Sequence, residues 1–165
     1  MSPEHRARVE ALNRQLLQHD SATETLARWR GVACAEVSAC RIGDDERAAD
    51  AETRALLEVG DGDLVRHRRV ELLVDGTILS EADNWYVPAR LTPEMNRCLD
   101  ESRTPFGAVV RPLGFRRRTL DAEILAGAPG PYIIRHRAVL VLADETPISL
   151  VVEGYTRALL DVAAG

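Results

Sequence analysis

The chain of 165 residues lacks the short motifs by which most cofactor-dependent enzymes are recognised. It contains no glycine-rich dinucleotide loop, no Walker loop and no G-x-S-x-G nucleophile elbow. Its three cysteines form no C-x-x-C pair, and its four histidines lack the spacing of a metal site. We therefore expect a protein that works with no metal, nucleotide or other cofactor.

Long apolar runs and a signal-like N-terminus are also absent, and the net charge is -5. Without a long apolar run we expect no membrane span, and without a signal-like N-terminus we expect no signal peptide. The negative net charge favours neither nucleic acid nor an anionic membrane as a partner. A cytoplasmic location is the default expectation. Arginines nevertheless cluster within residues 66–69, 116–118 and 135–137. Such clusters are usually solvated faces, although they are also able to bind a small anion.

What is present is the composition of an ordinary globular protein, with 45% hydrophobic and 28% charged residues. This length fits one domain, which we place over residues 1–165. Hydrophobic periodicity and capping residues predict helices over 4–18, 21–28, 51–58 and 93–101, and a short one after Thr104. Alternating patterns and turn signals predict strands over 32–42, 65–74, 78–87, 115–125, 132–142 and 147–156. Helices followed by hairpins indicate an α+β fold, an antiparallel sheet with helices packed on it.

Arg68 occupies an unusual place in this pattern. Side chains alternate between the two faces of a strand, so Arg68 shares a face with Val70, Leu72 and Val74 and points into the protein. An inward guanidinium is costly unless an anion meets it. Glu153, on the last predicted strand, is a second inward candidate. The two groups form either a structural ion pair or a binding site for a small acid, and an Arg whose head reaches water is the remaining alternative.

The register of the hairpin around Asp75 and Gly76 decides what lies beside Arg68. A two-residue turn pairs Arg68 with Asp83, which would neutralise it within the structure. A three-residue loop that includes Thr77 pairs it with Asn84 and leaves one face apolar and small. We prefer the second register for that reason, and Asn84 is then a polar neighbour for whatever Arg68 holds.

Three further segments carry weaker signals. The run Thr104-Pro105-Phe106-Gly107 opens a helix, whose free backbone N–H groups are able to bind a carboxylate but usually bind water. Ala22 and Thr23, at the start of another helix, are similarly ambiguous. Arg135 and Arg137 share a face with Val139 and Val141, so they either line the same cavity as Arg68 or flank its mouth.

The order and spacing of these motifs resemble the chorismate pyruvate-lyase family over nearly the whole chain. The similar features are a helix–break–helix over residues 16–26, Arg68 separated by six residues from Asp75-Gly76, a strand ended by Pro88, Thr104-Pro105-Phe106-Gly107, and a terminal strand from Leu150 to Tyr155. The resemblance implies an antiparallel sheet with packed helices that encloses an internal ligand cavity. It also implies conversion of chorismate to 4-hydroxybenzoate and pyruvate without a cofactor.

The resemblance implies functions for individual residues as well. Arg68 matches the arginine that holds the ring carboxylate of the substrate, and Glu153 matches the glutamate at the oxygen-bearing end of the ring. Phe106 and Gly107 match the motif that offers a backbone N–H, and Ala22 or Thr23 falls in the flap that closes the cavity. Glu153, in an apolar environment, would then either transfer a proton or polarise the hydroxyl end of the substrate. Assigning Arg135 or Arg137 to the enolpyruvyl carboxylate is our own inference from the alternating pattern.

Two departures from the family keep other functions open. Asn84 stands near the position of a second arginine in the best-known branch, and Ala22 is smaller than the residue found there. The protein is therefore expected to be a lyase, with a non-catalytic aromatic-acid binder as the alternative and a lyase or isomerase of another cyclic enol-ether acid as a third. The same fold also forms effector domains of transcription regulators, which carry a separate DNA-binding domain. We expect no such domain here, because the sequence offers no room for one ahead of the predicted fold.

Overall fold

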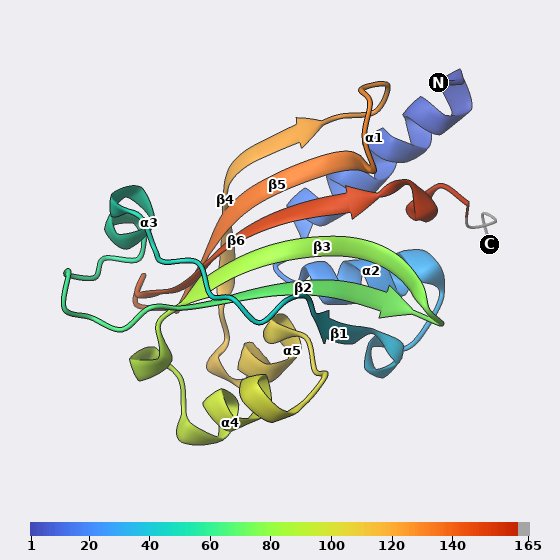
Figure 1. Ribbon diagram of the computed structural model, residues 1–165. Helices are drawn as coiled ribbons and strands as arrows, with labels where there is room; N and C mark the ends of the chain where they lie inside the picture. The colour runs from blue at the N-terminus through green and yellow to red at the C-terminus, as the bar shows by residue number, and fades with distance from the viewer. Residues whose placement is uncertain (162–165) are drawn as a thin grey trace.

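The computed structural model describes residues 1–161, which form an α+β fold built on one antiparallel sheet (Figure 1). The helices are α1 (Pro3–Gln18), α2 (Ala22–Arg30), α3 (Ala51–Leu56), α4 (Pro93–Glu101) and α5 (Phe106–Val110). The strands are β1 (Ser38–Arg41), β2 (Arg66–Val74), β3 (Thr77–Tyr86), β4 (Arg116–Ile124), β5 (Tyr132–Val141) and β6 (Pro147–Thr156). Short 3-10 turns lie at Cys34–Glu36, Pro88–Arg90, Arg111–Leu113 and Arg157–Leu159. The predicted fold class is thereby confirmed.

Helix starts follow from local capping chemistry. Ser2, Ser21 and Thr92 each accept a hydrogen bond from the backbone N–H three residues ahead, which satisfies a donor that has no partner inside the helix. Asp50 caps α3 in the same way, at 2.8 Å from the Thr53 nitrogen. Gly31 ends α2 in the left-handed conformation, with φ of 68°. These signals are local, which is why the sequence predicted the helices well.

The six strands lie in the order β1-β2-β3-β6-β5-β4, and every neighbouring pair is antiparallel. Helices α1, α2, α4 and α5 cover one face, where α1 contacts β4 and β5 and α2 shares a core cluster with residues of β2 (Figure 1). The segment after α3 covers part of the opposite face through Leu57, which belongs to one hydrophobic cluster with Val139, Val141 and Leu150. No helix among the described residues is long and apolar enough to cross a bilayer.

The β2–β3 hairpin combines parts of both predicted registers. Its turn is the strict two-residue one, with φ of 49° at Asp75 and 74° at Gly76, so the expected three-residue loop is wrong. A bulge then shifts the register, because Leu72 pairs with Ser80 while Leu73 pairs with Ile78. Beyond the bulge, Arg68 pairs with Asn84 as preferred. The extra residue in β3 therefore does what the longer loop was expected to do.

The first predicted strand, 32–42, is much shorter in the structure. A 3-10 turn occupies Cys34–Glu36, and only Ser38–Arg41 pairs with β2. The turn is fixed by the Glu36 carboxylate, which accepts a hydrogen bond of 2.7 Å from the Ala33 N–H. This side-chain bond offers the backbone an alternative to a sheet ladder, and it shortens the strand at the edge of the sheet.

Candidate functional site

A cavity of about 60 Å³ lies between the helix-covered face of the sheet and the N-terminal ends of α2 and α5. The sheet contributes Arg68, Asn84 and Glu153, with apolar side chains between them. Thr23 and Gly107 border the cavity from the helices. The cavity thus combines apolar walls with a few polar groups, which is the usual composition of a small-molecule site.

Arg68 is buried in this wall without a partner. The residue is 5% exposed, and no hydrogen bond or ion pair joins its guanidinium to another described residue. Burial lowers the pKa of Arg68 and the charge of Arg41 adds to this effect, which Tyr86 and Asp100 only partly offset. Because an arginine stays charged in proteins, the cavity holds a desolvated positive charge that a bound anion would neutralise.

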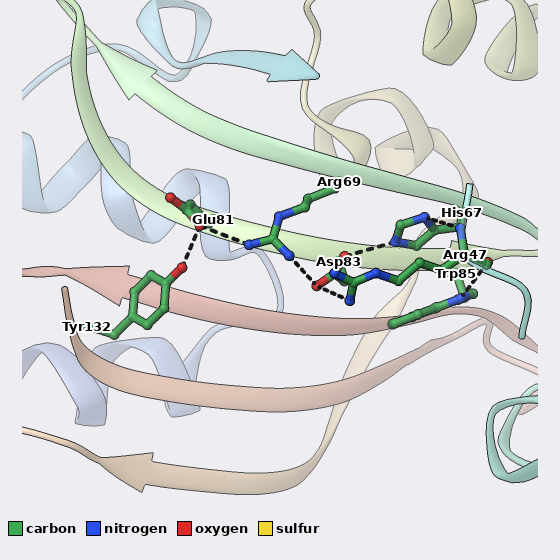
Figure 2. A network of polar contacts seen from close by, with 7 residues as sticks. All are labelled: Arg47, His67, Arg69, Glu81, Asp83, Trp85 and Tyr132. Carbon is green, nitrogen blue, oxygen red and sulfur yellow. Dashed lines mark hydrogen bonds and ion pairs between the residues drawn. The ribbon is translucent and has the colours of Figure 1, made fainter. Parts of the chain in front are cut away.

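The two carboxylates that the sequence offered as structural partners of Arg68 are both engaged elsewhere. Asp83 lies on the opposite face of β3, where His67 contacts it at 2.9 Å and Arg69 and Arg47 approach within 3.5 and 3.6 Å (Figure 2). The His67 ring is fixed there by the Arg47 backbone N–H, which donates to Nδ1 at 2.9 Å. Because Asp83 is engaged by these residues on the opposite face of the sheet, the alternative of an Arg68–Asp83 ion pair is excluded.

Glu153, the second carboxylate, is paired with Arg117 of β4. Arg117 Nη2 lies 2.5 Å from Glu153 Oε2, and the Tyr155 hydroxyl donates to the same oxygen at 2.7 Å. Burial alone would raise the pKa of Glu153, but the charge and hydrogen bonds of Arg117 outweigh burial and lower it. The same pair raises the pKa of Arg117 against the effect of its own burial. Glu153 is therefore an ionised, neutralised carboxylate.

Asn84 supplies the second unsatisfied group of the cavity. It faces Arg68 across the β2–β3 ladder and is 3% exposed. Neither its amide nitrogen nor its amide oxygen has a hydrogen-bond partner. Unpaired buried amides are rare because each lost hydrogen bond costs about 1–3 kcal/mol. Arg68 and Asn84 are thus two adjacent residues of the cavity wall that both have buried polar atoms without a hydrogen-bond partner.

The structure gathers most of the predicted site residues around this one cavity. Its wall includes Ala22, Thr23, Arg68, Asn84, Phe106, Gly107 and Glu153. What each of them contributes to a ligand remains a prediction.

The expectation that Arg135 or Arg137 lines the cavity is wrong, since neither residue belongs to the cavity wall. On β5 they pair with Gly154 and Val152, and alternation places them on the face opposite Glu153. There Arg137 contacts Glu52 at 3.2 Å, and Arg135 lies 4.0 Å from Glu123.

Arg117 is the cavity residue that sequence reasoning missed. It stands in the middle of three consecutive arginines, Arg116 to Arg118, which looked like an exposed basic cluster. Its side chain is nevertheless only 4% exposed. Alternation from Phe115, which also lines the cavity, was the available signal.

A second, larger space lies outside the cavity. This outer cleft has a volume of about 900 Å³ and runs between α2, the turn at Cys34–Glu36 and the segment before and within α5. Glu24 and Arg111 both line the cleft and contact each other at 2.9 Å. Six residues line both the cleft and the inner cavity: Asp20, Ser21, Thr23, Pro105, Gly107 and Phe115. A single layer of side chains therefore lies between the two spaces.

Metal chemistry has no visible basis in the part of the chain that the structure describes. No group of three or more His, Cys, Asp or Glu side chains comes together there. His136 hydrogen-bonds Asn13 through Nε2 at 2.7 Å, and burial, with Arg117 nearby, lowers its pKa to about 4. His136 is thus a neutral core histidine beside Glu153.

Comparison with known proteins finds one curated relative over almost the whole chain. The uncharacterized protein y4mC of Sinorhizobium fredii (strain NBRC 101917 / NGR234) is 38% identical over 181 aligned residues, which cover 94% of this chain and 76% of the relative. No known protein-family model matches the chain.

Solved structures share the fold at low identity. PhnF from Mycobacterium smegmatis is 18% identical with a TM-score of 0.61, covering 85% of this chain and 65% of PhnF. The effector domain of PhnF alone is 19% identical with a TM-score of 0.62, covering 84% of this chain and 90% of that domain. The ligand-binding domain of a putative GntR-family regulator from Bordetella bronchiseptica is 17% identical with a TM-score of 0.52, covering 74% of this chain and 87% of that domain. These likenesses show the chorismate lyase-like fold, and this chain spans about two thirds of full-length PhnF.

These structures correct the expectation of an enzyme. The solved structures that share the fold include an effector domain, a ligand-binding domain of a putative GntR-family regulator and a GntR-family transcriptional regulator, and these are regulators and not lyases. The resemblance to chorismate pyruvate-lyase therefore holds for the fold, and the predicted lyase activity is wrong. The ion pair between Glu153 and Arg117 agrees with this correction, because a carboxylate with a lowered pKa is a poor proton donor.

Proposed function

The chain belongs to the family of the uncharacterized Sinorhizobium fredii protein y4mC, and we propose that it is a non-catalytic binding protein for a small organic acid. The ligand's carboxylate is held by Arg68 and Asn84 in the inner cavity. Aromatic acids such as 4-hydroxybenzoate are the first candidates, because Phe106 and Phe115 line the cavity wall beside aliphatic side chains.

One observation carries this proposal: Arg68 and Asn84 are adjacent, buried and unpaired in the wall of the same cavity. An unpaired buried charge costs several kcal/mol, and a structural explanation for that cost is missing because Asp83 and Glu153 have other partners. A ligand carboxylate would satisfy the planar fork of Arg68 with two hydrogen bonds. It would also accept a hydrogen bond from the Asn84 amide.

The charges in the wall select for a single negative charge. Glu153 is neutralised by Arg117, which leaves Arg68 as the one buried cavity charge without a counterion among the described residues. A monocarboxylate balances it, whereas a dianion would bring a second desolvated charge. Two structural neighbours are an effector domain and a ligand-binding domain, which supports a binding function of this kind.

Calorimetric titration with 4-hydroxybenzoate, benzoate and other monocarboxylates tests the proposal. Wild type should bind at least one of them saturably, without turnover. Arg68→Met should weaken that binding roughly 30-fold or more, because truncating one partner of a buried charge pair costs about 2–5 kcal/mol.

Arg135→Met is the matched control. Arg135 is half exposed on the other face of the sheet, so the same substitution there should leave the affinity unchanged. The proposal fails if no monocarboxylate binds, or if Arg68→Met and Arg135→Met bind the acids equally well.

A further inference from the structure

The inner cavity is too small to enclose an aromatic acid completely. Its volume is about 60 Å³, whereas an engineered protein cavity that binds benzene measures about 150 Å³. A carboxylate and the atoms next to it fill such a space. The remainder of any larger ligand must therefore leave the cavity on the side where the wall is thinnest.

The residues that line both the cavity and the outer cleft form the wall between them, and Gly107 is the one residue of this shared set without a side chain. A β-carbon at position 107 would lie 3.8 Å from the Phe115 ring, 3.8 Å from Ser21 Oγ and 3.9 Å from Thr23 Oγ1. All three neighbours line both spaces. The missing side chain of Gly107 thus leaves a gap between the cavity and the cleft that a single methyl group would occupy.

The outer cleft has the size and chemistry for the rest of a ligand. At about 900 Å³ it falls in the range of small-molecule sites. Its charged lining is balanced, since Asp20 and Glu24 face Arg103 and Arg111, and Glu24 is already paired with Arg111 at 2.9 Å. Ser21, Thr23 and Thr104 add hydroxyl groups. This lining suits an uncharged part with hydrogen-bonding groups.

We propose that the ligand is an elongated monocarboxylic acid, with its carboxylate at Arg68 and an uncharged, hydrogen-bonding end that passes Gly107 into the outer cleft. This inference rests on the proposed function and adds the shape and polarity of the ligand. A compact aromatic acid is then only a fragment of what the site accepts.

A series of acids with the same head and a growing neutral tail tests the proposal. Acetate, N-acetylglycine and N-acetylglycylglycine differ by one peptide unit each, and NMR titration of the full chain gives their affinities. Each unit adds about four non-hydrogen atoms, so affinity should rise roughly tenfold per unit at ordinary ligand efficiencies. In Gly107→Val the gain with length should disappear, because the added methyl groups fill the gap.

Two further variants keep the result interpretable. Gly62 is a matched control, since a β-carbon there meets nothing within 4 Å, and Gly62→Val should retain the gain with length. If Gly107→Val does not fold, Gly107→Ala replaces it, because its β-carbon makes contacts of ordinary length. Its effect should have the same direction and be smaller.

Cysteine alkylation locates the tail independently. Cys34 lines the outer cleft, whereas Cys40 and Cys98 line neither space and serve as internal controls. N-acetylglycylglycine should slow alkylation of Cys34 alone, and acetate should slow none of the three.

The outcomes separate the two proposals. Equal affinities for the three acids, together with an unprotected Cys34 and Arg68-dependent binding, would overturn the elongated ligand and leave the proposed function standing. A failure of every acid, 4-hydroxybenzoate included, to bind would overturn both.

Discussion

Replacing Arg68 by Met should leave the ligand-free protein at least as stable as wild type, whereas the same replacement of Arg117 should destabilise it strongly. The two arginines form a matched pair, since both are buried in the wall of one cavity. They differ in one respect: Arg117 has Glu153 as a counterion, and Arg68 has no counterion in the described part of the chain.

The magnitudes follow from what each substitution leaves behind. Met keeps most of the arginine's volume, so at position 68 it removes a desolvated charge and leaves only the unpaired amide of Asn84 that was there before. At position 117 it leaves the Glu153 carboxylate buried with the Tyr155 hydroxyl alone. Breaking a buried pair in this way costs about 3–5 kcal/mol. For a chain of this size the loss corresponds to a decrease in Tm of roughly 6–20 °C.

Thermal unfolding followed by circular dichroism measures both effects at pH 7 without added acid. Repeating the melts at lower pH identifies the cause, because Glu153 in Arg117→Met has lost the charge that lowered its pKa. Burial then raises that pKa above the unfolded value, so protonation relieves the cost as the pH falls. The difference between wild type and Arg117→Met should therefore shrink on acidification.

A decrease in Tm of Arg68→Met as large as that of Arg117→Met would refute this reasoning. Arg68 would then be a structural group whose charge stabilises the empty protein. The assignment of the cavity as an anion site would lose its main support.

Three further predictions concern the groups around the cavity and the sheet. Glu153→Gln should destabilise the protein most at neutral pH and converge in stability with wild type in acid. The lowered pKa of Glu153 stabilises wild type above the unfolded pKa of about 4.3, and this stabilisation is lost as the pH falls through the folded pKa. Equal pH profiles of the two proteins in denaturant titrations would contradict the ion pair between Glu153 and Arg117. The folded pKa of His136, about 4, lies below its unfolded value of about 6.5, so wild-type stability should rise by about 3 kcal/mol from pH 4 to 6.5. His136→Gln should flatten that rise, and an unchanged slope would show that another group causes it. Gly154→Ala should cost roughly 1–3 kcal/mol, because its β-carbon would lie 2.7 Å from the Tyr132 ring, while Gly62→Ala, in open space, should melt like wild type.

Local sequence patterns predicted the strands of the sheet well, whereas features that depend on contacts between strands distant in sequence could not be predicted. Alternation in β2 placed Arg68 inward, and the preference for a register that keeps one face apolar placed it opposite Asn84. The bulge after Leu72, which makes that register compatible with a two-residue turn, leaves no mark in the sequence. The prediction was therefore right at Arg68 and wrong at the loop.

The candidate site was predictable residue by residue but not as an electrostatic unit. Glu153 was correctly expected to face inward, yet its ionisation depends on Arg117, which reaches it from β4 across β5. Three consecutive arginines gave no indication of which one is buried. The prediction that Arg135 and Arg137 line the cavity was wrong for a related reason. Alternation along β5 defines two faces, and only the pairing of β5 with β6 shows which face lines the cavity.

The central claim is that the cavity binds an organic acid through the charge of its carboxylate at Arg68. Competition between 4-hydroxybenzoate and 4-hydroxybenzamide tests it most directly, since the two molecules have nearly the same shape and differ in charge. Calorimetry on wild type and Arg68→Met should show that wild type binds the acid and strongly prefers it over the amide, and that this preference disappears in Arg68→Met. Equal binding of acid and amide by wild type, or a preference that persists without Arg68, would contradict the account.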